Sequence, residues 1–160
     1  MKTTLLRILK WVAIVLVLAA VGIQFVRPAR TNPPLEPAQT LEAHTQMTPE
    51  VAKIFERSCN DCHSNKTTWP WYTNVAPVSW WTIDHVNHGR SHLNYSEWGK
   101  LPRPDQEKSL QEICDEVLDG NMPLPSYLPM HPQARLSEPD KKVLCDWTEA
   151  ERQRMAAQLR

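Results

Sequence analysis

Glycine and phenylalanine are scarce in this chain. Its 160 residues include only 4 glycines and 2 phenylalanines, against 14 prolines and 7 tryptophans. Proline fixes the backbone and interrupts helices, so this composition predicts long, stiff and irregular connections. The tryptophans indicate large flat surfaces that pack around something large. Hydrophobic residues make up 41% and charged residues 22%, as in a folded chain, and the length suits one small domain.

The main part of the chain lacks an excess of basic charge. The formal net charge is zero, with 18 basic and 18 acidic residues, but five of the basic side chains lie in residues 1–30, which hold no acid. The remainder therefore has 13 basic and 18 acidic side chains, a net charge of −5. Nucleic-acid binding requires a basic surface, so no nucleic-acid partner is expected. A basic protein partner is compatible with this charge.

A long apolar run begins near the N-terminus. Residues 11–26 are interrupted only by Gln24. The run is preceded by the basic residues Lys2, Arg7 and Lys10. A membrane-spanning helix needs about 20 apolar residues, and the leucines before the run extend it towards that length. We therefore predict a membrane anchor over residues 1–27. The alternative is a cleaved signal peptide, whose cleavage signal is poor because the apolar run continues past Ala20.

A proline-rich linker is predicted over residues 28–47. Its hydrophobic residues repeat with neither a strand period nor a helix period, so it is expected to be a semi-rigid spacer that lifts a domain off the membrane. The domain then opens at Thr48-Pro49-Glu50, where a threonine cap, a first-turn proline and an acid are typical helix-start signals. The apolar residues that follow at helical spacing are Val51, Ile54 and Phe55.

The predicted helix leads directly into Cys59-Asn60-Asp61-Cys62-His63. C-x-x-C-H is the attachment motif of c-type haem. Two thiols about one helical turn apart can add to the two vinyl groups of one porphyrin, and the adjacent His63 can supply the proximal imidazole to the iron. The motif therefore predicts haem c, with Cys59 and Cys62 bonded covalently to it and His63 as the proximal iron ligand.

Three other interpretations of these cysteines are weaker. A redox-active C-x-x-C pair favours a βαβ context, which the sequence does not indicate. A zinc site would need a second ligand pair, and the sequence has no second C-x-x-C motif. A disulfide between Cys59 and Cys62 is uncommon at so short a spacing.

Two further helices are predicted after the motif. Residues 104–119 carry an apolar face and end before Gly120, a helix stop, and a last helix opens at Ser137. Their apolar faces hold Leu110, Ile113, Cys114, Val117 and Leu118 in the first and Val143, Leu144 and Trp147 in the second. The prediction is a mainly α, cytochrome c-like haem-binding domain over residues 48–152, with long Pro/Trp-rich loops and a polar tail over residues 153–160.

This order of elements resembles the layout of class I cytochromes c. In that family the first and last helices cross, and a methionine in a proline-rich loop is the second axial ligand of the iron. The resemblance implies that Met122, in the segment Gly120-Asn121-Met122-Pro123, is the sixth ligand. Met130, in another proline-bounded loop, is its rival. Further candidates are His131, His85 and His88.

Tryptophan-rich segments fill the middle of the chain. They read W-P-W-Y over residues 69–72, P-V-S-W-W over 77–81, H-V-N-H-G-R over 85–90 and L-N-Y-S-E-W over 93–98. Together with C-x-x-C-H-S-N, they resemble the bacterial haem-binding domain family. The resemblance covers roughly residues 45–150. It implies a haem protein that is often membrane-anchored, and it implies no settled reaction.

Several single residues have more than one interpretation. Trp69, Trp71, Trp80 and Trp81 are expected to pack in the core rather than to relay electrons or to form the walls of a haem pocket. Arg90, read as following a helix stop at Gly89, can pair with a haem propionate or form an ordinary surface salt bridge. Cys114 and Cys145 lie outside any C-x-x-C motif. In an oxidising compartment spare cysteines usually pair, so a Cys114–Cys145 disulfide is predicted, with two buried thiols as the alternative.

Two classes of function stay open. The first is an electron carrier with both axial positions of the iron filled, which works with a redox partner protein. The second is a haem enzyme or sensor, peroxidase-like or gas-binding, with an open or labile sixth position. No Ser-His-Asp set, phosphate loop or paired carboxylates stand out, so the carrier is favoured over an enzyme. The basic N-terminus predicts a single-pass protein of the bacterial inner membrane with its C-terminal domain in the periplasm.

Overall fold

The structure is a computed structural model that describes residues 2–158. Over these residues the chain forms helices and irregular connections without a β-strand, which confirms the predicted mainly α fold. The α-helices are α1 (Lys2–Gly22), α2 (Leu41–His44), α3 (Pro49–Ser58), α4 (Asn60–His63), α5 (Val78–His92), α6 (Arg103–Leu118) and α7 (Glu138–Ala157). Short 3-10 helices are η1 (Ile23–Phe25), η2 (Pro37–Gln39), η3 (Trp71–Asn74), η4 (Tyr95–Lys100) and η5 (Pro132–Ala134).

The chain divides into two compact units. The first, here called the N-terminal unit, comprises Met1–Thr31 and Trp69–His85. The second, here called the core unit, comprises Asn32–Thr68 and Val86–Arg160. Helix α5 passes from one unit to the other after His85, so each unit is described by itself.

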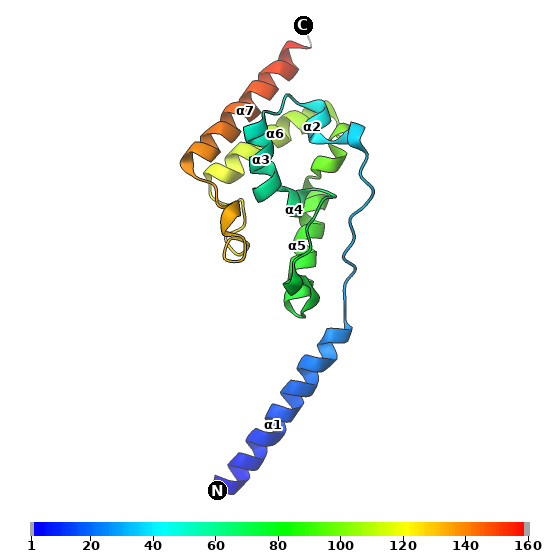
Figure 1. The fold of residues 1–160 in the computed structure, drawn as a ribbon, viewed down its shortest axis with the longest axis vertical. Coiled ribbons are helices and arrows are strands. Elements are labelled where there is room, and N and C mark those ends of the chain that lie inside the picture. Colours follow the sequence, from blue (N-terminus) through cyan, green and yellow to red (C-terminus); the bar gives the residue numbers. More distant parts are fainter. Residues whose placement is uncertain (1, 159–160) are drawn as a thin grey trace. The chain divides into compact units, whose positions relative to one another are not determined.

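The N-terminal unit contains the predicted apolar helix. The stretch Thr3–Phe25 consists of α1 from its second residue onward together with η1. It has 23 residues and a mean hydropathy of 2.3, and it is not buried within the protein. Figure 1 shows α1 as one long helix followed by an extended chain. By length and composition this helix can be a membrane span or a signal sequence.

The core unit is built on three helices. Thr48 caps α3 because its hydroxyl accepts a hydrogen bond from the Val51 N–H at 3.3 Å. Helices α6 and α7 lie side by side (Figure 1), and α3 packs against α7, where the Phe55 and Trp147 rings meet edge to face at 5.5 Å. The contact between first and last helices of the domain is the one that the resemblance to class I cytochromes c implied. The buried cluster among these helices holds Leu41, Val51, Ile54, Phe55, Leu93, Tyr95, Trp98, Leu110, Ile113, Val117, Leu136, Leu144, Trp147 and Met155.

The folded core extends beyond the predicted limits of 48 and 152. Within the predicted linker, Thr40 caps the short helix α2, and Leu41 is buried in the core cluster. At the other end, α7 continues through the predicted polar tail as far as Ala157, and Met155 is buried in the same cluster. A single apolar residue supports each extension, which is too little to produce a period in the sequence. The division of the chain into domains stays a prediction, but residues 40–41 and 153–157 pack with the core.

Candidate functional site

The C-x-x-C-H segment lies at a sharp junction between two helices. Cys59 ends α3, where its N–H donates to the Phe55 carbonyl at 3.0 Å, and the same residue precedes the single turn of α4. The His63 N–H donates back to the Cys59 carbonyl at 3.0 Å, which closes that turn. Cys59 and Cys62 are half-buried and are not bonded to each other. Two uncombined thiols therefore stand one helical turn apart, directly before the imidazole.

Both thiols are held in the neutral form. Burial, with a smaller contribution from the neighbouring Cys62, raises the pKa of Cys59 to about 12. Burial, with a smaller contribution from Asp61, raises the pKa of Cys62 to about 11. A redox-active C-x-x-C pair instead has a lowered pKa at its attacking cysteine, which supplies the thiolate. The electrostatic environment therefore argues against the redox-pair interpretation of this motif.

His63 has the tautomer that an iron ligand requires. Its Nδ1–H donates to the Leu93 carbonyl at 3.0 Å, so in the neutral ring the lone pair is on the second nitrogen, Nε2. Burial lowers the pKa of His63, against the opposing effect of the hydrogen bond to Leu93, and this favours the neutral ring. The ring lies beside Tyr95, with the ring centroids 5.6 Å apart. A neutral imidazole fixed through Nδ1 is the usual donor to a metal.

Helix α5 packs closely against the motif at Gly89. A Cβ atom at this position would lie 2.7 Å from the Cys62 carbonyl oxygen and 3.2 Å from its carbonyl carbon. Only glycine permits this approach. The interpretation of Gly89 as a helix stop is therefore wrong, because α5 continues through it to His92. The glycine is required by the distance between two backbones rather than by a turn.

Arg90 holds the segment that follows the motif. Its Nε donates to the Ser64 carbonyl at 2.8 Å, and one terminal nitrogen donates to Thr67 Oγ1 at 2.6 Å and to Asn32 Oδ1 at 2.8 Å. The acceptors of these three bonds are neutral oxygens, and pairing of Arg90 with a propionate or in a surface salt bridge stays a prediction. Arg90 fixes the chain on the C-terminal side of His63.

Asp61, one of the two spacer residues inside the motif, connects it to the loop that carries both candidate methionines. The Tyr127 hydroxyl donates to Asp61 Oδ2 at 2.7 Å, and the Thr68 N–H donates to Oδ1 at 2.9 Å. Tyr127 also stacks on His131, with centroids 3.9 Å apart and an interplanar angle of 7°. Asp61 and Tyr127 could not be predicted as a pair, because a spacer residue and a lone loop tyrosine carry no sequence signal.

The two candidate methionines differ in their surroundings. Met122 is half-buried against the core cluster, where Cys59 also packs, and its N–H donates to the Glu116 carbonyl at 3.0 Å. The chain turns into this loop at Gly120, which has a φ of 75°. Met130, by contrast, is 55% exposed. Of the two, Met122 lies on the same buried cluster as the motif.

The other candidate residues take different places. The His85 Nδ1–H donates to the Trp81 carbonyl at 2.8 Å, and its ring lies 4.2 Å from the Trp81 ring. His88 is exposed.

The expectation that the tryptophans of the central segments pack in the core is wrong for two of them, since Trp71 is 71% exposed and Trp81 is 47% exposed. The predicted disulfide between Cys114 and Cys145 is confirmed, with an S–S distance of 2.04 Å.

Comparison with known families identifies the domain. A sequence model described as a haem-binding domain matches residues 18–150, which is most of the chain. The chain belongs to the haem-binding domain family. It is therefore a haem-binding protein, and the match extends from the C-terminal part of α1 to α7. Neither the curated proteins nor the solved structures include a significant match.

The donor set of this haem-binding domain suits the group that the family binds. Haem c needs two free thiols near one edge of the porphyrin and a neutral imidazole with an available nitrogen, and Cys59, Cys62 and His63 provide these groups. Zinc would need further ligands, and among residues 2–158 no group of three or more His, Cys, Asp or Glu side chains is arranged to hold a metal ion. The residues therefore fit haem better than a bare metal.

Proposed function

We propose that this protein is a membrane-anchored c-type cytochrome that carries one covalent haem and transfers electrons outside the cytoplasm. The observation that supports it most strongly is the arrangement at the α3–α4 junction. There, two uncombined thiols one turn apart precede an imidazole whose Nδ1 is already bonded to the Leu93 carbonyl. His63 Nε2 is then the proximal iron ligand. Family membership supports haem in general, and the motif supports its covalent attachment.

The attachment reaction needs only the two thiols and the two vinyl groups. Cys59 and Cys62 would each hold the haem through one thioether, the net product of adding one S–H across one C=C bond, with no atom lost. The neutral state of both buried thiols is compatible with this net addition. Haem would supply a one-electron iron couple, while the Leu93 carbonyl fixes the imidazole and the Tyr127–Asp61 hydrogen bond ties the loop of Met122 to the motif.

Electron transfer is favoured over an enzyme or sensor by the position of Met122. A thioether on the sixth position would raise the reduction potential and leave no open site for a substrate. Met122 packs on the core cluster that Cys59 also contacts, and the Tyr127–Asp61 hydrogen bond ties its loop to the motif. The net charge of −5 beyond residue 30 is compatible with a basic redox partner in the periplasm.

Covalent attachment is tested by variants of the motif. We expect haem to stay with the polypeptide on a denaturing gel when the protein is made in a host with cytochrome c maturation. Cys59→Ala and Cys62→Ala should each leave at most one thioether, and the double variant should release its haem into acid acetone. The matched control is Cys114→Ser/Cys145→Ser, which removes two cysteines outside the motif and should retain the haem. Extraction of haem from the wild type by acid acetone would contradict the proposal.

Carbon monoxide separates the two classes of function. A carrier with both axial positions filled should show the same reduced absorption spectrum with and without the gas. A shifted spectrum at low carbon monoxide concentration would show an open or labile sixth position. In that case the enzyme or sensor interpretation would replace the electron carrier, although haem attachment would stand.

A further inference from the structure

Gln24, the polar interruption of the apolar run, has a partner far along the chain. Its Nε2 donates to the Ala76 carbonyl at 3.0 Å, and its Oε1 accepts from the Ala76 N–H at 3.0 Å. The same Nε2 donates to the Ala20 carbonyl at 3.0 Å. Gln24 therefore pairs with both polar groups of one residue in the tryptophan-rich segment, as a neighbouring β-strand would. A carboxamide at the edge of an apolar span is costly unless it is paired, and here it is paired.

Two more hydrogen bonds join the same parts of the N-terminal unit. The indole N–H of Trp80 donates to the Val26 carbonyl at 2.6 Å, and the Arg30 guanidinium donates to Thr73 Oγ1 at 3.4 Å. All of these contacts lie at the C-terminal end of the apolar helix, where the chain leaves Thr3–Phe25. Residues 73–80 are thus fixed to the exit of that helix.

The segment fixed there carries exposed apolar side chains, here called the tryptophan patch: Trp71, Val75, Val78 and Trp81. Val78 and Trp81 lie three residues apart in the first turn of α5, so they share one side of it, and Val75 lies just before the helix. Phe25, at the end of the apolar helix, is 83% exposed. Large apolar side chains in one such group mark an interaction site rather than a solvated surface.

We propose that the tryptophan patch inserts into the headgroup layer of the bilayer that the apolar helix spans, on the side where the chain leaves it. This inference rests on the proposed anchor. The 23 residues of Thr3–Phe25 cover about 35 Å as a helix, against a hydrocarbon core of about 30 Å, so the Gln24–Ala76 pair lies at the boundary with the headgroups. Tryptophan prefers that layer.

Charge on the same segment agrees with a lipid surface. Arg27 and Arg30 directly follow the apolar helix, and Arg27 is held there by a hydrogen bond from its Nε to the Gln24 carbonyl at 2.9 Å. Cations just outside the hydrocarbon attract anionic headgroups. The hydrogen bonds of Gln24 and Trp80 fix the patch-bearing segment to the end of the helix, so a bilayer that the helix spans lies close to the patch. Segment 71–81 is then a second contact with the membrane beside the helix itself.

Photo-crosslinking to lipid tests this inference in the full-length protein. Trp71, Trp81, Phe25 and Leu118 are each replaced singly by p-benzoylphenylalanine, and the proteins are reconstituted into vesicles of phosphatidylethanolamine and phosphatidylglycerol. Leu118 is the matched control, because it is 56% exposed but lies on the core unit. After irradiation, mass spectrometry should find lipid adducts at positions 71 and 81 in a yield comparable to that at position 25. Position 118 should give no lipid adduct.

Any other pattern of crosslinks would overturn the inference, and each pattern would identify which part of it is wrong. Adducts at position 25 with none at 71 and 81 would overturn the patch and leave the anchor intact. Crosslinks from 71 or 81 to a second copy of the chain would assign the patch to a protein interface and overturn the lipid contact. No adduct at position 25 would overturn the anchor, and the inference with it. A further variant, Gln24→Leu, should lose the adduct at 71 and keep the one at 25, and an unchanged yield at 71 would overturn the role of the Gln24 pair.

Discussion

At the scale of single residues, the closest backbone approach at the motif occurs at Gly89. Gly89→Ala would place a methyl group 2.7 Å from the Cys62 carbonyl oxygen, and the atoms it meets are backbone and cannot move aside alone. We expect α5 and α4 to be forced apart, with a loss of stability of about 1–3 kcal/mol and reduced yield of attached haem. Thermal unfolding followed by the Soret circular dichroism of the holoprotein measures the first effect, and the pyridine haemochrome assay measures the second.

The matched control for Gly89→Ala is Gly22→Ala. A Cβ at Gly22 would have no atom within 4 Å, so this substitution adds the same methyl group to a helical glycine without a clash. It should leave both the thermal transition and the haem content unchanged. If Gly89→Ala behaved like Gly22→Ala, the close packing of α5 on the motif would be refuted.

The identity of the sixth ligand is decided at two methionines. We expect Met122→Ala to lose the far-red sulfur-to-iron charge-transfer band of the oxidised protein, because Met122 packs on the cluster that Cys59 also contacts. Met130→Ala is the control and should keep the band, since Met130 is mostly exposed. A band that survives in Met122→Ala, or that the wild type lacks, would exclude Met122 as the ligand and favour an open or different sixth position.

Roles with a recognisable sequence signal could be predicted, such as a helix cap or a pair of spare cysteines, and contacts that depend on the folded path of the chain could not. Thr48 as a helix cap and the Cys114–Cys145 pair were both anticipated and are confirmed. Arg90, by contrast, was expected to bind a carboxylate, and its contacts with Ser64 and Thr67 could not be foreseen because they need the folded path of the chain. Gly89 was misread for the same reason.

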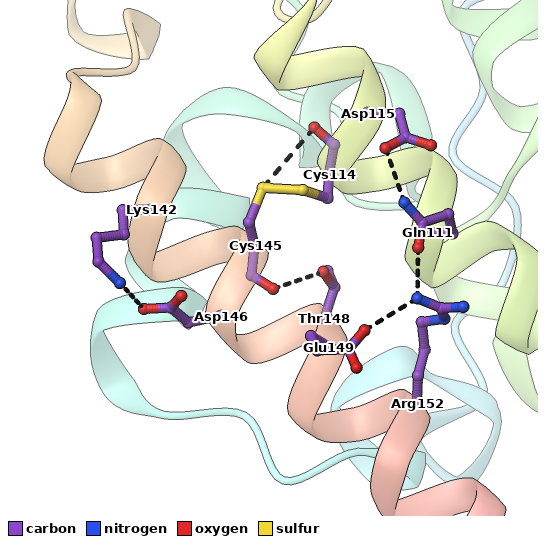
Figure 2. The surroundings of a disulfide bond; sticks show 9 residues. All are labelled: Gln111, Cys114, Asp115, Lys142, Cys145, Asp146, Thr148, Glu149 and Arg152. Carbon is purple, nitrogen blue, oxygen red and sulfur yellow. Dashed lines mark hydrogen bonds and ion pairs between the residues drawn. A yellow bond between two sulfur atoms is a disulfide. The ribbon is translucent and has the colours of Figure 1, made fainter.

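At the scale of elements, one covalent bond connects the last two long helices. Figure 2 shows the Cys114–Cys145 disulfide between α6 and α7, flanked by the Arg152–Glu149 and Lys142–Asp146 ion pairs on α7. The ion pairs are exposed and stabilise little. The disulfide closes a loop with a sequence separation of 31 residues, which contains the whole methionine-bearing loop.

Removal of this disulfide should therefore lower stability without removing the haem. We expect Cys114→Ser/Cys145→Ser to reduce the free energy of unfolding by on the order of 3 kcal/mol, because the unfolded chain gains freedom over the 31-residue separation. Urea unfolding of wild type and variant measures the difference. Dithiothreitol should lower the wild-type midpoint to that of the variant and leave the variant unchanged. Two alkylatable thiols in unreduced wild type would contradict the bond.

Helices were predictable where the apolar period was long, and their ends were not. The face of α6 that buries Leu110, Ile113 and Val117 was recognised from its spacing. In the polar tail predicted over residues 153–160, Met155 is buried, and the buried position one turn before it is the charged Glu151. Glu151 is buried but paired, since its Oε1 accepts from the Gln46 N–H at 3.0 Å and its Oε2 accepts from Arg154. A buried carboxylate whose oxygens are all paired interrupts the apolar spacing by which a helix is recognised in a sequence.

At the scale of the whole molecule, the sequence separates an apolar, basic beginning from an acidic remainder. The first 30 residues hold five of the basic side chains and no acid, and they include the helix that can span a membrane. The acidic remainder includes the C-x-x-C-H motif and the core cluster against which Cys59 packs. This division suits a protein in which one segment fixes the location and the other holds the haem.

The anchor itself is open to a direct test. We expect the full-length protein to stay in the membrane pellet after alkaline carbonate extraction, because residues 11–26 are apolar apart from Gln24, and Gln24 is paired. Leu16→Arg places a charge near the middle of the span at a cost of about 2.5–3.5 kcal/mol for insertion and should shift protein to the soluble fraction. Leu16→Ile, the matched control, keeps the span apolar and should stay in the pellet. Mass spectrometry of the mature protein must find the intact N-terminus, since a mature chain that begins near residue 20 would show a cleaved signal sequence in place of an anchor.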